Sequence, residues 1–169
     1  MKKFTADNLI CMTPEDKAFM QAAIKMSEDN VISGNGGPFG AVVVKNGKII
    51  GRGFNRVTAT NDPTAHAEIM AIREACAHLK NFQLENCEIY TSCEPCPMCL
   101  GAIYWARPAK IFYANSKEDA ADINFDDQFI YEELERPIEK RRLFTQQMMR
   151  DEALQAFKLW ADSTKKIDY

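Results

Sequence analysis

Residues 88–105, EIYTSCEPCPMCLGAIYW, decide the fold, because they join an expected β-strand directly to an expected helix. The β-forming residues 88–91 predict the strand. Proline is favoured in the first turn of a helix, so a short helix is predicted from Pro95 to about Trp105. A further strand is predicted at residues 110–114, KIFYA. Strands that alternate with helices are typical of an α/β domain, in which helices cover a sheet.

The segment nearest the N-terminus contains the signals of another helix. Thr13 as N-cap and Pro14 at the first helical position predict a helix that ends near Asn30. The run SGNGGP that follows, residues 33–38, is rich in residues that break regular structure. We therefore expect a loop there.

A hairpin and a further helix are expected next. Asn-Gly at residues 46–47 separates the β-forming runs 41–45 and 48–51, and this is the strongest short-range signal of a β-hairpin. The run NDPT, residues 61–64, predicts the N-terminal cap of a helix. The inward side of that helix is predicted from apolar residues at helical spacing, namely Ile69, Ile72, Cys76 and Leu79.

The order of these elements predicts a three-layer α/β/α fold with a central mixed sheet. We expect one domain over residues 1–169, because no linker or internal repeat divides the chain. Its core is expected within residues 14–135, followed by a C-terminal helix and tail at residues 151–169. The elements expected in the C-terminal part are helices at residues 127–135 and 151–162 and a possible strand at residues 143–148.

The composition favours a small neutral substrate. The 169 residues carry a formal net charge of −3, and the sequence pI is about 5.5, whereas nucleic-acid binding depends on basic groups. The basic clusters at residues 140–142 and 165–166 are short and flanked by acids, so they are interpreted as a solvated face. No segment approaches the roughly 20 apolar residues of a membrane span. We expect a cytoplasmic protein without a nucleic-acid or membrane partner.

The six cysteines are interpreted as buried thiols and metal ligands, because disulfides are rare in a reducing compartment. Cys93, Cys96 and Cys99 follow one another at intervals of three residues, and a metal site, a redox couple and a disulfide would each use a different subset. On the predicted helix Cys96 lies in the first turn and Cys99 on the same face, so both sulfurs can reach one ion. Cys93 precedes the helix and is assigned as a structural thiol.

A histidine and a glutamate complete the expected site. His66-Ala67-Glu68 opens the second helix, about thirty residues before Cys96. With His66, Cys96 and Cys99 as its protein ligands, a zinc ion keeps its fourth position for water, which is typical of catalytic sites. Glu68 can take the proton of that water and pass it on. The alternatives are a redox pair, half of a structural zinc site, or a zinc-stabilised binding module, but none of these uses Glu68.

These motifs resemble one known family. The H-x-E and P-C-x-x-C motifs at residues 66–68 and 95–99 are the signature of zinc nucleobase deaminases, so the chain is identified as similar to the cytidine deaminase-like zinc superfamily. The resemblance to the bacterial guanine deaminases is strong over residues 14–135 and weaker after them. The stretches that carry it are residues 36–57, 61–76, 91–107 and 125–131, together with Tyr169.

The resemblance implies a reaction and a cofactor. It implies the hydrolytic deamination of guanine to xanthine and ammonia by attack of activated water at C2, with one zinc ion per subunit. Another small base or nucleoside, such as cytosine or guanosine, is the alternative substrate. A tRNA adenosine deaminase shares the zinc motif, but the acidic chain disfavours a nucleic-acid substrate.

The resemblance also implies the residues that bind the purine, namely Phe39, Asn55, Ala67, Trp105 and Tyr169. Asn55 would hydrogen-bond the ring, and Phe39 and Trp105 would line a flat pocket. Each also has a plainer interpretation, since the two aromatic residues can belong to the core and Asn55 can end a strand in a turn.

Two residues of the C-terminal part complete the implied site. Asp127 would lie near the exocyclic amine and help to move protons, although a helix N-cap also accounts for it. In the bacterial guanine deaminases the C-terminal segment crosses to the partner subunit, where the terminal tyrosine closes the site. Tyr169 is in the corresponding position, so a homodimer with exchanged C-terminal segments is expected.

Overall fold

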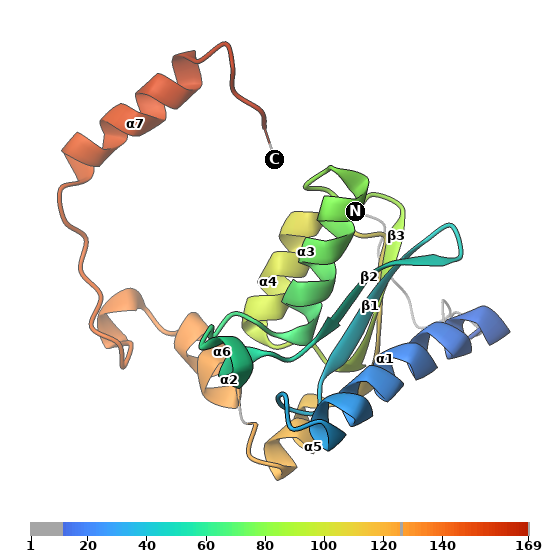
Figure 1. Cartoon of the computed structure of the whole chain (residues 1–169). Coiled ribbons are helices and arrows are strands. Elements are labelled where there is room, and N and C mark those ends of the chain that lie inside the picture. The colour runs from blue at the N-terminus through green and yellow to red at the C-terminus, as the bar shows by residue number, and fades with distance from the viewer. Residues whose placement is uncertain (1–11, 126, 169) are drawn as a thin grey trace. The chain divides into compact units, whose positions relative to one another are not determined.

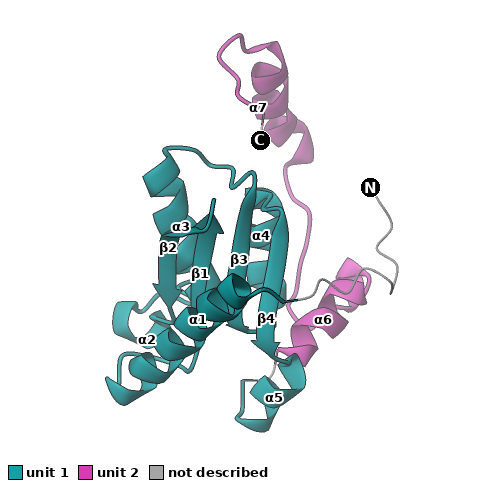
Figure 2. Ribbon diagram, turned by 90° about the vertical axis from the view of Figure 1, so that its right-hand side faces the viewer, with its two compact units in different colours: residues 1–125 teal, residues 126–169 magenta. Residues whose placement is uncertain are grey.

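The computed structural model describes residues 12–125 and 127–168. The chain divides into two compact units, residues 1–125 and residues 126–169 (Figure 2), which are described separately. The expectation of a single domain over the whole chain stays a prediction. Tyr169, which the resemblance places in the site, lies outside the described residues.

The first unit is built on a four-stranded sheet in the order β2-β1-β3-β4 (Figure 2). β1 is antiparallel to β2 and to β3, whereas β3 and β4 are parallel. Asn46 and Gly47, between β1 and β2, have φ angles of 50° and 70°, as a tight hairpin turn requires. The predicted hairpin and mixed sheet are confirmed. The strands are β1 (Gly40–Lys45), β2 (Lys48–Phe54), β3 (Cys87–Cys93) and β4 (Lys110–Asn115).

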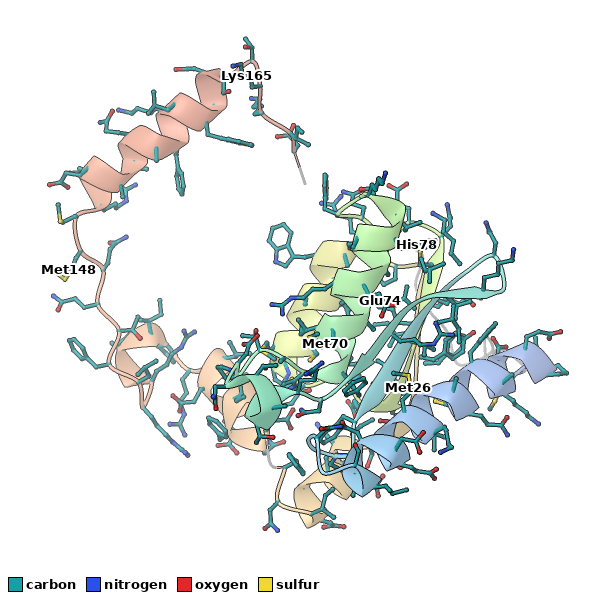
Figure 3. All side chains as sticks on the ribbon, in the orientation of Figure 1. Met26, Met70, Glu74, His78, Met148 and Lys165 are labelled. Atoms are coloured by element: carbon teal, nitrogen blue, oxygen red, sulfur yellow. The ribbon has the colours of Figure 1, made fainter. Side chains whose placement is uncertain are left out.

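Helix α1 (Pro14–Ile32) covers one face of this sheet. Its start is the predicted one, with Thr13 as the N-cap and Asp16 as its partner in a capping box. Apolar side chains of α1, Met26 among them, point toward the sheet (Figure 3). They pack against alternate residues of β1 and β3, namely Val42, Val44 and Tyr90.

Helices α3 (Ala67–Leu79) and α4 (Pro97–Ala106) lie on the other face (Figure 1), which confirms the three-layer α/β/α fold. Gly53 lets α3 approach β2 closely, since a Cβ on this residue would lie only 1.9 Å from the Ala67 carbonyl oxygen. Gly51 has the same effect one turn further along α3. Only small side chains fit at this contact, and the apolar residues of α3 that are buried there are Ala67, Ala71 and Ala75.

The predicted inward side of α3 is therefore only partly correct. Three of its four residues, Ile72, Cys76 and Leu79, are half-buried at the margin of the core, but Ile69 does not belong to the core cluster. The two glycines of β2 bring α3 so close to the sheet that large side chains do not fit between them. The large apolar residues of α3 therefore lie on either side of the row of alanines. Along another side of α3, Met70, Glu74 and His78 follow one another at intervals of four residues (Figure 3).

The predicted cap of α3 at residues 61–64 is wrong. Asn61 ends a short additional helix, α2 (Val57–Thr60), in the left-handed conformation. The Asp62 carboxylate accepts the backbone N–H of Thr64 at 2.8 Å, so it closes a local turn and does not cap α3. The N-cap residue of α3 is His66.

One further helix of the first unit, α5 (Lys117–Asp122), was not expected from the sequence. Ser116 and Asp119 form a capping box at its start, and this S-x-x-D pattern is the signal that would have predicted it. Neither α5 nor any other helix in the described residues is long and apolar enough to cross a membrane.

The second unit contains α6 (Gln128–Glu135), the short 3-10 helix η2 (Ile138–Lys140) and α7 (Arg150–Asp162). The two helices predicted for this part are confirmed. The prediction of a possible strand at residues 143–148 is wrong. The described part of the second unit contains no strand, so this segment has no partner strand there to satisfy its backbone hydrogen-bonding groups. None of the residues of the three helices is buried.

Candidate active site

The three predicted ligand residues meet where α3 and α4 begin. His66 is the N-cap of α3, Cys96 is the N-cap of α4, and Cys99 lies in the first turn of α4. The Nδ1 atom of His66 lies 3.6 Å from Cys96 Sγ and 3.5 Å from Cys99 Sγ. One ligand atom from each residue lies within 4.8 Å of the other two. The fold thus brings residues from two helices into one cluster.

The dimensions of this cluster suit a zinc ion. In a tetrahedral site, Zn–S bonds of about 2.3 Å and Zn–N bonds of about 2.05 Å place a sulfur and a nitrogen roughly 3.6 Å apart. Both distances from His66 to the cysteine sulfurs are close to this length. An imidazole nitrogen and two thiolates are also donors that zinc prefers. Three protein ligands leave the fourth tetrahedral position open.

The start of α4 differs from the prediction at one of these ligands. Pro97, rather than Pro95, occupies the first helical position, so Cys96 is the N-cap residue instead of a residue of the first turn. Its backbone is extended, and the chain enters the helix only after it. Cys96 and Cys99 still lie at the N-terminus of α4, where free N–H groups and the helix dipole stabilise thiolates.

Hydrogen bonding makes the two thiols unequal. A hydrogen bond from Cys99, together with one from His66, lowers the pKa of the Cys96 thiol to about 4. The same bond to Cys96, together with burial, raises the pKa of the Cys99 thiol. Cys96 is therefore the more readily deprotonated of the two thiols. Both cysteines would bind zinc as thiolates, so zinc binding would favour loss of the Cys99 proton as well.

Glu68 lies in the first turn of α3, beside the ligand cluster, and is only 5% exposed. Its carboxyl group accepts hydrogen bonds from Thr91 Oγ1 at 3.1 Å and from Cys99 Sγ at 3.4 Å. Burial raises the pKa of Glu68, and these hydrogen bonds limit the rise. A carboxyl group with a raised pKa exchanges protons more readily near neutral pH, as a general acid-base must.

Thr91 is a residue of the site that the sequence analysis did not select. It is almost fully buried and donates its hydroxyl group to Glu68. The signal was available, because alternate residues of a strand point to the same face. Ile89 belongs to the core beneath α3 and α4, so Thr91, two residues later, points to the same side. A buried hydroxyl group there requires a hydrogen-bond partner.

Cys93 lies outside the ligand cluster. It is the last residue of β3 and is buried, with its Sγ atom 3.5 Å from the carbonyl oxygen of Ser116. Within the described part of the chain, the group of residues able to hold a metal contains His66, Cys96 and Cys99 without Cys93. This position agrees with its assignment as a structural thiol.

Asn55 directly follows β2 and is almost completely buried. Its Oδ1 atom accepts the backbone N–H of Val57 at 3.2 Å. Through this oxygen Asn55 acts as a turn residue, as its plainer interpretation predicts. Its backbone N–H donates to the Phe39 carbonyl oxygen at 3.1 Å. The other half of the side chain, Nδ2, has no hydrogen-bond partner among the described residues.

The other residues implied for purine binding in this unit have different surroundings. The ring of Phe39 is partly buried against the core and meets Phe125 edge-on, with 4.9 Å between the ring centroids. Ala67 is fully buried at the start of α3. Trp105, near the end of α4, is 63% exposed. Phe39 therefore contributes to the core, whereas Trp105 does not.

Asp127 occupies the N-cap position of α6, at the start of the predicted helix, but its side chain makes no capping hydrogen bond there. It belongs to the second unit, whereas the ligand cluster belongs to the first. The roles of Asp127 and Tyr169 at the site therefore remain proposals.

The comparison with known families agrees with this geometry. Residues 13–115 match the model of the cytidine and deoxycytidylate deaminase zinc-binding region. The chain belongs to this family of zinc-dependent deaminases. Its cofactor is accordingly zinc, and the cluster of His66, Cys96 and Cys99 provides one site per chain within the described residues.

Individual relatives narrow the class further. The chain is 52% identical over 153 residues to guanine deaminase from Bacillus subtilis. The aligned region covers 90% of this chain and 98% of that protein. The X-ray structure of that protein has a TM-score of 0.88 over the same shares of both chains. A guanine deaminase structure from Nitrosomonas europaea is 35% identical, with a TM-score of 0.63, over 70% of this chain and 67% of its own. A tRNA-specific adenosine deaminase from Aquifex aeolicus is 47% identical over 77 residues, 46% of this chain and 51% of its own.

Proposed function

We propose that this protein catalyses the hydrolytic deamination of guanine to xanthine and ammonia. The observation that carries the proposal is the cluster of His66, Cys96 and Cys99, which leaves one metal position open and has the buried Glu68 carboxyl group 3.4 Å from Cys99 Sγ. A structural zinc site has no use for such a carboxyl group. Similarity to a guanine deaminase over 98% of that enzyme's length supports guanine as the base.

The reaction requires one bond to form and one to break at C2 of guanine. The C2–O bond forms from water and the bond from C2 to the exocyclic nitrogen breaks, so one water proton must reach the ring nitrogen N3 and the other the leaving amine. A zinc ion held by His66, Cys96 and Cys99 would supply the Lewis acid that activates the water. Glu68 carries the first proton to N3 as the C2–O bond forms, and it carries the second, from the hydroxyl group now on C2, to the amine, which leaves as ammonia. Thr91 orients Glu68 by donating to its Oε1 atom, while Oε2 faces Cys99.

Asn55 supplies a hydrogen-bond donor for the base. Because the backbone N–H of Val57 occupies Oδ1, the orientation of the Asn55 amide is fixed and Nδ2 is the half that remains for a ligand. Guanine offers a carbonyl oxygen at position 6 as an acceptor, whereas adenine carries an amino group there. The donor therefore favours guanine. Phe39 and Trp105 contribute aromatic surface for the flat ring, and Ala67 contributes a small side chain beside it.

We also propose a homodimer with exchanged C-terminal segments, in which Asp127 assists proton transfer at the amine and Tyr169 covers the base. The exposed apolar side chains of the second unit support a partner surface, because Leu143, Phe144 and Phe157 are each more than 70% exposed. We place the enzyme in the cytoplasm, where a reducing environment would keep the five described cysteines as free thiols.

Ammonia release from a panel of substrates tests this function. The panel contains guanine, guanosine, adenine, adenosine, cytosine, cytidine and a tRNA anticodon stem-loop. We expect the highest kcat/KM with guanine. A higher value with cytosine, with a nucleoside or with the tRNA substrate would contradict guanine as the substrate. Zinc-loaded protein that releases no ammonia from any of them would instead indicate a binding module.

A further inference from the structure

We propose that Asn30 is a positioning residue of the purine site, which holds Asn55 in place by bonding its backbone to the Gly37 loop. This inference rests on the proposed function, because it assumes that Asn55 donates a hydrogen bond to guanine. Asn30 itself is assigned no contact with the substrate.

Asn30 connects two loops that are distant in the sequence. It lies in the last turn of α1 and is 3% exposed. Its Nδ2 atom donates to the Gly37 carbonyl oxygen at 2.8 Å and to the Asn55 carbonyl oxygen at 2.9 Å. Gly37 belongs to the loop before β1, and Asn55 follows the end of β2. One amide group therefore fixes the spacing between these two loops.

Backbone hydrogen bonds extend this connection to Phe39. The N–H of Phe39 donates to the Gly37 carbonyl oxygen at 2.8 Å, and the N–H of Asn55 donates to the Phe39 carbonyl oxygen at 3.1 Å. Asn30, Gly37, Phe39 and Asn55 thus form a closed ring of hydrogen bonds. Because the Asn55 side chain is bonded to the next turn of its own backbone, a shift of that backbone also shifts the Nδ2 donor.

Close packing leaves little freedom at the same point. A Cβ atom at Gly36 would lie 2.3 Å from the Asn55 carbonyl oxygen and 3.1 Å from the Asn30 Nδ2 atom. The loop backbone therefore lies directly against the carbonyl group that Asn30 holds. Movement toward the loop is blocked by contact, and movement away from Asn30 breaks its hydrogen bond.

The Oδ1 atom of Asn30 indicates that the residue is present for the two hydrogen bonds that its Nδ2 atom donates. Its Oδ1 atom is buried and has no hydrogen-bond partner among the described residues. A buried acceptor without a partner lowers stability. An apolar residue of similar size would avoid that loss, but the Asn55 carbonyl group would lose the bond from Asn30 and the Gly37 carbonyl group would keep the Phe39 N–H alone. We infer that asparagine is needed here for its two donated bonds.

A double-mutant cycle with Asn55 tests the inference. Asn30→Ala, Asn55→Ala and the double variant are compared by kcat and KM for guanine, zinc content and Tm. We expect Asn30→Ala to keep its zinc and to lose roughly tenfold or more in kcat/KM, as displacement of a substrate-positioning group does. The loss should appear mainly in KM, because Asn55 contacts the base both before and during the reaction. In the Asn55→Ala background, Asn30→Ala should change kcat/KM by less than about twofold.

Two further variants make the test specific. Asn35→Ala removes an exposed asparagine of the same loop, whose Nδ2 donates to Ser33 Oγ, and it should leave kcat and KM unchanged. Asn30→Asp keeps the shape of the side chain but removes the donor. If Asn30→Ala does not fold, Asn30→Asp replaces it in the same double-mutant cycle with Asn55→Ala.

The outcomes separate this inference from the function on which it rests. If Asn55→Ala leaves guanine turnover intact, Asn55 does not bind the base and both proposals fail at this residue. If Asn55→Ala is impaired but Asn30→Ala is not, the inference alone is wrong. An equal loss from Asn30→Ala in both backgrounds would show a general effect on the fold and would also overturn the inference.

Discussion

The metal cluster and the C-terminal unit differ in how their functional side chains are held. His66, Cys96 and Cys99 lie at the starts of two helices that pack on a sheet, and the neighbouring Glu68 is buried with hydrogen bonds from Thr91 and Cys99. In the second unit, α6, η2 and α7 have no buried residue. Its apolar residues, such as Phe157 and Leu159, are both 74% exposed.

This difference shows which part of the proposed site the chain can build alone. The ligand cluster is organised by the core of the first unit, so its geometry needs no partner. None of the described residues in the helices of the second unit is buried, and such helices are stabilised when their apolar sides are covered. The contributions proposed for Asp127 and Tyr169 therefore depend on a contact beyond the unit itself.

The largest expected effect tests whether the first unit holds the metal with the residues named. Cys96→Ser or Cys99→Ser should lose zinc and reduce guanine turnover by more than about 10³, since the metal contributes several kcal/mol to the transition state. Cys93→Ser should keep one zinc ion per chain. Metal analysis of the three variants checks this. Equal zinc loss in Cys93→Ser would show that a different pair of cysteines binds the ion.

The next largest effect separates proton transfer from metal binding. Glu68→Gln should retain zinc and fold but lose roughly 10²–10⁴ in kcat, the range for removal of a general acid-base. Zinc content and steady-state kinetics are measured on the same preparation. Turnover close to that of the wild-type protein, with zinc retained, would contradict the assigned role.

A smaller effect tests the contribution of the second unit. Removal of residues 165–169 should leave folding and zinc intact but lower kcat/KM for guanine by roughly tenfold to hundredfold, because a group that positions and covers the base is lost. Removal of residues 151–169 should also abolish the dimer, as measured by light scattering. Unchanged turnover in the shorter deletion would refute the closing role of Tyr169.

Mixing two impaired proteins tests the exchange of C-terminal segments itself. The deletion of residues 165–169 keeps Glu68, and Glu68→Gln keeps the tail. After subunit exchange, a mixed dimer can combine an intact Glu68 with the tail of its partner. Recovery of activity would support a site shared between chains, whereas two proteins that exchange subunits without recovery would speak against it.

The smallest expected effect concerns the stability of the first unit. A hydrogen bond from Tyr90, with further bonds from Thr13, lowers the pKa of Asp16 below its usual value of 3.8. The stabilisation is therefore fully present above the unfolded-state pKa and is lost as pH falls through the lower folded-state value. Asp16→Asn should cost roughly 0.5–1 kcal/mol at pH 7. It should also make the decline of stability below about pH 4 shallower.

Urea unfolding of both proteins at several pH values between neutral and acid checks this prediction. Thr13→Ala removes the other half of the capping box and serves as the matched control for loss of the helix start. A steeper acid decline in Asp16→Asn than in the wild-type protein would contradict the sign of the effect.

The sequence alone predicted those elements whose signals are local. Thr13 and Pro14 predicted the start of α1, and Asn46-Gly47 predicted the hairpin, because caps and tight turns depend on the conformations of a few adjacent residues. The cap of α3 was predicted incorrectly for a related reason. Asp62 also has a local partner, Thr64, and a sequence does not show which of two local bonds forms.

Other features depended on residues that are distant in the chain. The small residues on the inner side of α3 follow from Gly51 and Gly53 in β2, which set the distance between helix and sheet. The possible strand at residues 143–148 failed because a strand needs a partner, and its own periodicity does not supply one. Thr91 and Asn30 were missed because their importance lies in the carboxyl and carbonyl groups they contact.

The sequence by itself determined the class of chemistry, because the spacing of His66, Glu68, Cys96 and Cys99 specifies ligands, helix starts and a proton carrier within short segments. Tertiary structure decided which atoms meet. It placed the imidazole 3.5–3.6 Å from both sulfurs and joined the Gly37 and Asn55 loops through Asn30. Such contacts join segments tens of residues apart, and their geometry is fixed only when the sheet and its helices pack together.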